Sequence, residues 1–92
     1  MSGYSVELTR RAQKQLGSID RKAALLISRY IDQNLDGCDD PRAVPGAKKL
    51  QGVEDGWRWR VGTYRILGTV DDGRVVIEVF RIGHRREVYR NL

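Results

Sequence analysis

The final third of the chain carries the repeat of residue types that most restricts its fold. Trp57-Arg-Trp-Arg-Val61 alternates apolar and basic side chains, which is typical of a β-strand with one buried face. Gly62-Thr63 follows as a two-residue hairpin link, and glycine in its first position suits a type II′ turn. Residues 64–70 return as a second strand, Asp71-Asp-Gly73 predicts another hairpin, and residues 74–82 form a third, mostly apolar strand. The segment therefore predicts three consecutive antiparallel strands.

The first half of the chain predicts one strand and two helices. Residues 4–8 alternate loosely as a short strand, and Thr9 is suited to cap a helix over residues 10–16 that Gly17 ends. A longer helix starts at Ser18 or Asp20 and stops at Gly37. Apolar residues recur along it at intervals of three and four, so we expect this stripe to be core. Its members are Ala23, Leu26, Ile27, Tyr30, Ile31 and Asn34 or Leu35.

The order of the expected elements is β-α-α-β-β-β. This order predicts an α+β fold in which two helices pack on one face of a small, mainly antiparallel four-stranded sheet. Residues 37–46 and 52–56 predict loops, because glycine, proline and aspartate are concentrated in or around them. A length of 92 residues suits one folding unit, so we expect residues 1–92 to form a single domain.

The counts of cysteine and histidine exclude several classes of protein. Cys38 is the only cysteine, so no disulfide can form within the chain, and with His84 as the only histidine no zinc site can be assembled. The carboxylates follow no divalent-metal pattern. There is no signal-peptide pattern and no long apolar run. We therefore expect a cytoplasmic protein that needs no metal or cofactor and binds no membrane.

Positive charge is concentrated at the carboxyl-terminal end of the chain. The net charge is +5, and from Trp57 onward eight arginines face four acidic residues, with no lysine. Arginine presents a planar fork that holds phosphate in a bidentate manner, so the bias predicts a phosphate-bearing partner, with nucleic acid the leading candidate. The alternative is a basic surface that serves only solubility. The eight arginines are Arg58, Arg60, Arg65, Arg74, Arg81, Arg85, Arg86 and Arg90.

Strand alternation predicts that several of these arginines share one face of the sheet. If the tryptophans of residues 57–61 face the helices, Arg58 and Arg60 face the opposite, open side, and Arg65 joins them from the next strand. Arg85 and Arg86 arrive from the end of the third strand. We expect Arg65 and Arg85 to be exposed, so that replacing either with alanine leaves the fold intact. Such a concentration of like charge destabilises the chain unless an anion neutralises it.

Two other side chains at this end could transfer protons. Tyr89 could act as a general base beside the arginines, since guanidinium groups stabilise a phenolate, or it could simply pack the tail. His84 titrates near neutral pH in its unperturbed form, but it could equally be a turn residue. Arg81 breaks the pattern, because simple alternation places it on the helix side. Either Gly83 marks a bulge, or Arg81 has a structural role.

The residue types present favour one kind of phosphate chemistry. No serine lies in the basic region, and Gly68, Gly73 and Gly83 do not form a phosphate-binding loop. A nucleophile supplied by the substrate remains, and RNA supplies its own 2′-hydroxyl. Arginines would stabilise the extra negative charge of the pentacoordinate phosphate. The sequence therefore predicts a protein that acts on RNA.

Three motifs in order resemble the RelE toxins of the RelE/ParE toxin–antitoxin superfamily. They are Lys48-Lys49-Leu50-x-Gly52, Trp57-Arg-Trp-Arg-Val-Gly-x-Tyr64-Arg65-Ile and Ile82-Gly-His-Arg85-x-x-Val88-Tyr89. The resemblance runs nearly end to end. It implies a type II toxin that cleaves mRNA in the ribosomal A site as a metal-independent endoribonuclease, through attack by the 2′-hydroxyl, and so inhibits translation. It also implies a cognate RelB-like antitoxin that silences the toxin.

The resemblance also implies roles for individual residues. Tyr89 matches the family's proposed general base, Arg85 the residue that protonates the leaving oxygen, and Arg65 the residue that stabilises charge on the phosphate. Arg58 and Arg60 match catalytic positions that are lysines in the best-known member, and arginine holds its proton more firmly than lysine. His84 is a further catalytic candidate. The expected substrate-binding residues are Lys48, Lys49 and Arg86.

Two other functions fit the same fold. A ParE-like toxin would inhibit DNA gyrase by binding it, without nuclease activity. A module that binds RNA and does not cleave it would also use a basic face. Fold alone does not separate these alternatives, because function depends on the site.

Overall fold

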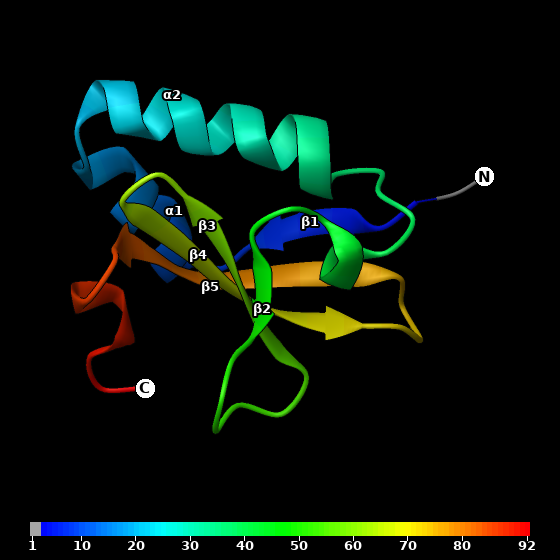
Figure 1. Ribbon diagram of the computed structural model, residues 1–92. Coiled ribbons are helices and arrows are strands. Elements are labelled where there is room, and N and C mark those ends of the chain that lie inside the picture. Colours follow the sequence, from blue (N-terminus) through cyan, green and yellow to red (C-terminus); the bar gives the residue numbers. More distant parts are fainter. Residues whose placement is uncertain (1–2) are drawn as a thin grey trace.

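The chain folds into one five-stranded sheet with two helices on one of its faces (Figure 1). The computed structural model describes residues 3–92, so Met1 and Ser2 of the expected domain lie outside it. The sheet has the order β1-β5-β4-β3-β2, in which β1 is parallel to β5 and the other pairs are antiparallel. The elements are β1 (Ser5–Leu8), α1 (Arg10–Ser18), α2 (Arg21–Tyr30), a π-helical turn (Ile31–Leu35), a 3-10 turn (Pro41–Ala43), β2 (Ala47–Lys49), β3 (Gly56–Val61), β4 (Tyr64–Asp71), β5 (Val76–His84) and a 3-10 turn (Glu87–Tyr89).

The predicted α+β class is confirmed, and the predicted number of strands is one too low. The missing strand is β2, which has three residues and no alternation of apolar and polar side chains. Its place in the sheet comes from pairing with β3, where Lys48 lies opposite Arg58. Pairing with a distant segment leaves no local signal in so short a strand. Within residues 3–92, no helix is long and apolar enough to cross a membrane.

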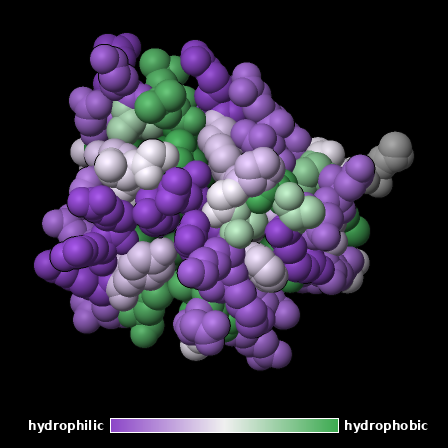
Figure 2. All heavy atoms as spheres, in the orientation of Figure 1, coloured by the Kyte–Doolittle hydropathy of each residue, from purple (hydrophilic) through white to green (hydrophobic). Residues whose placement is uncertain are grey.

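The main core lies between the helices and the sheet. Trp59 and Ile66 from adjacent strands are fully buried there, and Ile27 of α2 packs against them. Ile27, Ile31 and Leu35 confirm most of the stripe that the helical periodicity predicted. Leu26 was wrongly included, because its side chain is 54% exposed on the outer surface of α2. A hydrophobic area over α2 is visible in Figure 2.

Both helices begin at the residues that the sequence indicates. The Thr9 side chain accepts a hydrogen bond from the Ala12 amide at 3.1 Å, and Asp20 does the same for Ala23 at 3.2 Å. Each side chain satisfies one of the unpaired amides of a first helical turn. The first helix continues through Gly17 to Ser18, slightly beyond the predicted end.

A β-bulge in β5 explains the position of Arg81. Leu67 lies opposite Arg81, and the next residue of β4, Gly68, lies opposite Val79, so Phe80 is the extra residue. A bulge of this kind shifts the alternation by one residue. Arg81 therefore shares the open face with Leu67 rather than the helix side. The bulge lies at Phe80 and not at the proposed Gly83, which pairs normally with Arg65.

A second, smaller hydrophobic cluster lies on the open face of the sheet. Leu50, Leu67 and Val88 are buried in it, with Val53 and Phe80 packed beside them. Val88 belongs to the C-terminal segment, which we define as residues 85–92. This cluster holds the segment against the side of the sheet that the helices leave uncovered.

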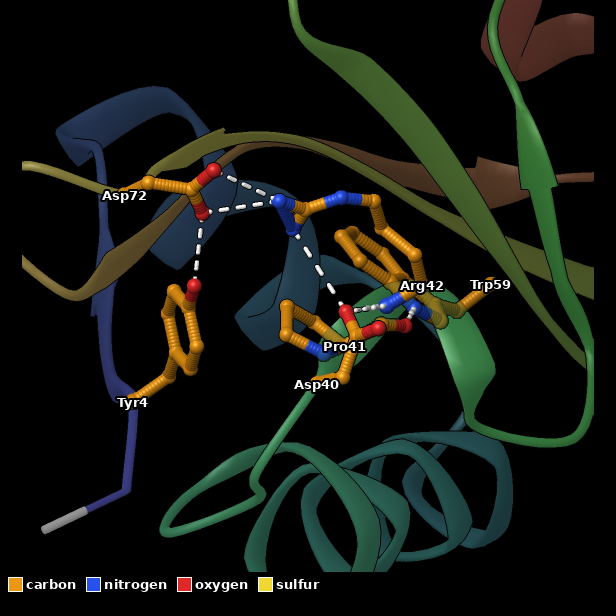
Figure 3. A network of polar contacts seen from close by, with 6 residues as sticks. All are labelled: Tyr4, Asp40, Pro41, Arg42, Trp59 and Asp72. Atoms are coloured by element: carbon orange, nitrogen blue, oxygen red, sulfur yellow. Dashed lines mark hydrogen bonds and ion pairs between the residues drawn. The ribbon is translucent and has the colours of Figure 1, made fainter.

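A polar network joins three separate parts of the chain (Figure 3). Arg42 donates to both carboxylate oxygens of Asp72, at 2.7 and 2.8 Å, and Tyr4 donates its hydroxyl to Asp72 at 2.6 Å. The buried indole of Trp59 donates to the Pro41 carbonyl oxygen at 2.9 Å. These contacts tie the loop before β2 to β1 and to the turn between β4 and β5, and so fix the end of the sheet opposite the C-terminal segment.

The two hairpins use different residues for their reversals. Gly62 has φ +60° and Thr63 has no positive φ, as the predicted type II′ turn requires. The second turn occupies residues 72–75, and its left-handed residue is Val75, with φ +57°, instead of the glycine that the sequence suggested. The Val75 carbonyl oxygen accepts a hydrogen bond from Ser5 of β1 at 3.0 Å, which holds this conformation.

We predict that Val75→Gly raises the free energy of unfolding by about 1 kcal/mol, since a β-branched residue is strained in the left-handed region. Urea denaturation measures the change. Gly73→Ala is the matched control, because Gly73 has no positive φ and an added Cβ would make only an ordinary van der Waals contact, with the Asp71 Oδ1 at 3.5 Å. Gly73→Ala should leave stability unchanged or slightly raised. A large loss with Gly73→Ala, and no gain with Val75→Gly, would contradict this description of the turn.

Candidate functional site

Strands β2, β3 and β4 place basic residues on the open face of the sheet. Lys48 lies opposite Arg58, and Arg60 lies opposite Arg65. Directly opposed residues of antiparallel strands point to the same side. The tryptophans of β3 pack toward the helices, so these four basic residues point away from them. The face predicted for Arg58, Arg60 and Arg65 is therefore the face that they occupy.

The open face contains two adjoining hollows. The first has a volume of about 360 Å³ and is lined by Arg58, Arg65, Arg85, Arg86 and Tyr89. The second, of about 430 Å³, shares Arg58 and Tyr89 with the first. It is completed by Lys48, Lys49, Leu50, Gln51 and Leu92. We call the two together the basic groove. Figure 2 shows hydrophilic residues gathered where the C-terminal segment lies in Figure 1.

Another hollow, at the far end of β4, has the opposite charge. It has a volume of about 480 Å³ and is lined by Glu54, Asp55 and residues 69–72, which include Asp71 and Asp72. Carboxylates repel phosphate, so this hollow does not suit a nucleic acid. Among residues 3–92, no three His, Cys, Asp or Glu side chains are grouped as metal ligands.

Arg65 is held by the hairpin that it helps to form. Its Nη1 donates to the carbonyl oxygens of Gly62 at 3.0 Å and Tyr64 at 2.9 Å. The Arg65 side chain is half-buried rather than fully exposed. Desolvation lowers the pKa of Arg65 and the charges of Arg58 and Arg60 lower it further, while Tyr89 opposes the shift. The expectation that Arg65 is freely exposed was therefore wrong. A bound anion would relieve the repulsion among these arginines.

Arg58 is fixed from the neighbouring loop. Its Nη1 donates to the Gly46 carbonyl oxygen at 2.9 Å, and the Arg60 amide donates to the same oxygen at 3.1 Å. Gly46 has φ +95°, and a Cβ there would lie 3.0 Å from the Arg60 carbonyl oxygen, so only glycine fits. Tyr30 secures the loop by donating to the Pro45 carbonyl oxygen at 2.7 Å. Sequence reasoning treated Gly46 only as the end of a loop.

The C-terminal segment brings the remaining groups to the groove. The Arg85 amide donates to the Thr63 carbonyl oxygen at 2.8 Å, which directs the chain back over the open face. A 3-10 turn follows, in which the amides of Tyr89 and Arg90 bond the carbonyl oxygens of Arg86 and Glu87 at 3.3 and 3.2 Å. The Tyr89 side chain is 37% exposed and lines both hollows. Tyr89 therefore lies among the arginines rather than in the core.

Two of the predicted site residues lie outside the basic groove. His84 lies opposite Tyr64, and their rings meet edge to face at 5.3 Å and 89°. Tyr64 packs on the main core, so the imidazole is on the helix side of the sheet, away from Tyr89. Arg60 is exposed on the open face and does not line either hollow, although its charge acts on Arg65.

No acidic side chain neutralises the basic groove. The ion pairs within residues 3–92 join Arg42 to Asp40 and Asp72, and Arg74 to Glu7. None of them involves an arginine or lysine of the groove. The positive charge is thus left available to an external anion, and the bidentate fork of arginine suits phosphate. Sequence reasoning missed Leu50, Gln51 and Leu92 as lining residues, because nothing in the local sequence marks them.

Comparisons with known proteins match most of this chain to proteins of toxin–antitoxin systems. A family model described as the ParE toxin of the type II toxin–antitoxin system parDE matches residues 6–89. Toxin RelG of Mycobacterium tuberculosis is 27% identical over 89 residues, covering 95% of this chain and 97% of its own. The toxin–antitoxin complex RelBE2 of the same organism has a similar chain, with TM-score 0.78 and 24% identity over 92% of this chain and 94% of that one.

Two further structures have similar folds. A mutant of Escherichia coli toxin RelE in the free state gives TM-score 0.74 at 25% identity, over 97% of this chain and 92% of that one. The archaeal RelE–RelB complex of Pyrococcus horikoshii gives TM-score 0.73 at 26% identity, over 94% of this chain and 98% of that one.

The two arginines expected to be exposed should differ in their effect on stability. Arg65→Ala removes a charged donor from the carbonyl oxygens of Gly62 and Tyr64, so we predict a loss of about 1–2 kcal/mol in the free energy of unfolding. Arg85→Ala removes an exposed side chain and should cost less than about 0.5 kcal/mol. Urea denaturation of both variants measures the difference. Equal losses would show that the Arg65 contacts do not stabilise the hairpin.

Proposed function

This chain belongs to the RelE/ParE superfamily of toxins from type II toxin–antitoxin systems, and we propose that it is a ribosome-dependent endoribonuclease that cleaves mRNA in the A site. The observation that carries the proposal is the groove in which Arg58, Arg65, Arg85, Arg86 and Tyr89 meet. Four guanidinium groups with no acidic partner favour a phosphate ligand. A phenol in the same hollow supplies a group that can exchange a proton.

The proposed reaction uses the substrate's own nucleophile. Tyr89 acts as the general base that accepts the proton of the 2′-hydroxyl, and the 2′-oxygen attacks the adjacent phosphorus. Arg65 stabilises the charge that develops on the phosphate oxygens. The bond between the phosphorus and the 5′-oxygen breaks, and that oxygen takes a proton from the Arg85 guanidinium group, which regains one from solvent. The products are a 2′,3′-cyclic phosphate and a 5′-hydroxyl, and no step requires a metal ion.

The remaining groove residues are proposed to bind the substrate. Arg58 holds the phosphate backbone within the groove, and Arg60, which lies outside the groove on the same face, adds its positive charge. Arg86, Lys48 and Lys49 extend the contact along the RNA. His84 is not included among the proposed catalytic groups, because its ring lies on the helix side of the sheet against Tyr64.

The form of the groove supports a requirement for the ribosome. Both hollows are open to solvent, and Tyr89 is partly exposed, so the protein alone offers little to orient a flexible RNA. In-line attack needs the 2′-oxygen, the phosphorus and the leaving oxygen to be aligned. The ribosome would hold the message in that arrangement, and such positioning is worth several kcal/mol.

We also propose a RelB-like antitoxin as the partner that silences this chain. Several structural neighbours are complexes of RelE with RelB. An acidic segment of the antitoxin would neutralise the basic groove. Leu25 and Leu26, 56% and 54% exposed on α2, offer an apolar surface to an amphipathic segment.

A second candidate function is inhibition of DNA gyrase. The matching family model is described as the ParE toxin, which supports this alternative. Gyrase inhibition would require binding to the enzyme, with no proton transfer by Tyr89. Tyr89 and the arginines of the groove would then act only as contact residues.

The central test is the cleavage of mRNA with and without ribosomes, measured by primer extension. We expect codon-phased cuts on translating ribosomes and negligible cleavage of free RNA. Tyr89→Phe should reduce the cleavage rate by about 100-fold or more, because it removes the general base. Tyr64→Phe is the matched control, since its ring is outside the groove, and it should cleave at nearly the wild-type rate.

Equal cutting of RNA with and without ribosomes would contradict the proposed mechanism. A supercoiling assay with purified gyrase tests the alternative. Inhibition of supercoiling that survives in Tyr89→Phe, together with no cleavage of mRNA by the wild-type protein, would favour a ParE-like function.

A further inference from the structure

Arg81 is the only charged residue that is buried among residues 3–92. Its side chain is 7% exposed, and no carboxylate lies within ion-pair distance of it. Burial of a charge is costly unless hydrogen bonds compensate for the loss of water. The partners of this guanidinium group therefore reveal what the residue does.

All the partners of Arg81 are backbone carbonyl oxygens of the C-terminal segment. Its Nη1 donates to Val88 at 3.2 Å and also to Arg90, and its Nη2 lies 3.5 Å from the carbonyl oxygen of Asn91. The remaining donor, Nε, is buried without a partner. One side chain from β5 thus gathers three carbonyl oxygens, one before Tyr89 and two after it.

The local backbone explains why these carbonyl oxygens need an external donor. The 3-10 turn Glu87–Tyr89 is not continued by further helical turns. No helical amides are therefore available to its last carbonyl groups. Asn91 has φ +58°, which directs the chain away from helical geometry. The guanidinium group fills the role of the missing helical amides. The bulge at Phe80 makes this possible, because it turns Arg81 to the open face.

The apolar side chain that anchors the C-terminal segment is Val88, which precedes Tyr89 in the sequence. Val88 is 3% exposed in the cluster with Leu50 and Leu67. It also lies over Gly83, where an added Cβ would be 3.4 Å from the Val88 Cβ. Beyond Tyr89, the side chains of Arg90 and Leu92 are exposed, so Arg81 supplies the contacts that hold this part. Tyr89 is thereby fixed on both sides.

We propose that Arg81 is a positioning residue for cleavage: it holds the C-terminal segment so that the Tyr89 phenol stays beside Arg58 and Arg65. This inference rests on the proposed function for its catalytic consequence. It does not place Arg81 in contact with RNA, since Arg81 lines neither hollow of the basic groove. Its effect on the reaction passes through Tyr89.

The first test is the single-turnover cleavage rate on saturated ribosomes. Arg81→Met keeps the length of the side chain and removes every donor. We expect the rate to fall on the order of 100-fold, as for a small misplacement of a catalytic group, with ribosome affinity nearly unchanged. Arg90→Met is the matched control, because it removes one charge from the same segment and keeps the backbone carbonyl oxygen that Arg81 binds. It should cleave close to the wild-type rate.

A double-mutant cycle separates positioning from other effects. If Arg81 acts through Tyr89, Arg81→Met should cause almost no further loss of rate in a Tyr89→Phe background. Additive losses would overturn the inference. Arg81→Lys keeps a donor and should recover part of the rate that Arg81→Met loses.

Hydrogen–deuterium exchange tests the structural step without reference to activity. In Arg81→Met we expect protection to be lost at the amides of Tyr89 and Arg90, while β3 and β4 keep theirs. Unchanged exchange in this segment would overturn the inference, as would a cleavage rate equal to that of the wild type. If the wild-type protein does not cleave mRNA on ribosomes, the proposed function fails. In that case the hydrogen–deuterium exchange measurement still tests whether Arg81 holds the C-terminal segment in place.

Discussion

Three arginines of the open face are fixed by backbone carbonyl oxygens, and the arrangement of the site depends on this choice of partner. Arg58 bonds Gly46, Arg65 bonds Gly62 and Tyr64, and Arg81 bonds the C-terminal segment. A carbonyl oxygen orients a guanidinium group without cancelling its charge, whereas a carboxylate would do both. These arginines are therefore held in place while their positive charge remains available to an anion. Desolvation is the main cause of the lowered pKa of Arg65, and repulsion from Arg58 and Arg60 lowers it further.

The two faces of the sheet differ in what they contain: the main apolar core lies on one and the basic groove on the other. The helix face contains Trp59, Ile66 and most of the apolar core, and none of the buried residues of this core is charged. The open face has only the small cluster around Leu67 and Val88, which holds the C-terminal segment together with Arg81. Because the proposed binding groups lie opposite the main core, we expect substitutions in the basic groove to alter recognition more than folding. Arg65 and Arg81 are exceptions, since each also supports the backbone.

Local patterns predicted the helices, the hairpins and the shared face of Arg58, Arg60 and Arg65. These features depend on alternation, caps and turn residues within a few positions of one another. The errors arise where distant segments decide the outcome. The strand β2 exists through pairing with β3, and the face of Arg81 is set by an extra residue at Phe80. Leu26 is apolar and correctly spaced, yet α2 turns it outward, because periodicity cannot set the width of the buried stripe.

The parallel pairing of β1 with β5 has a consequence for the order in which the chain can fold. Ser5 lies opposite Val76, so the first strand finds its place only after more than three quarters of the chain is available. Contacts between segments so far apart in sequence form slowly, because a long loop must close before they contribute. A partly synthesised chain lacks both the β5 scaffold and the segment that carries Tyr89. The proposed nuclease site could therefore assemble only after residues 76–89 have been synthesised.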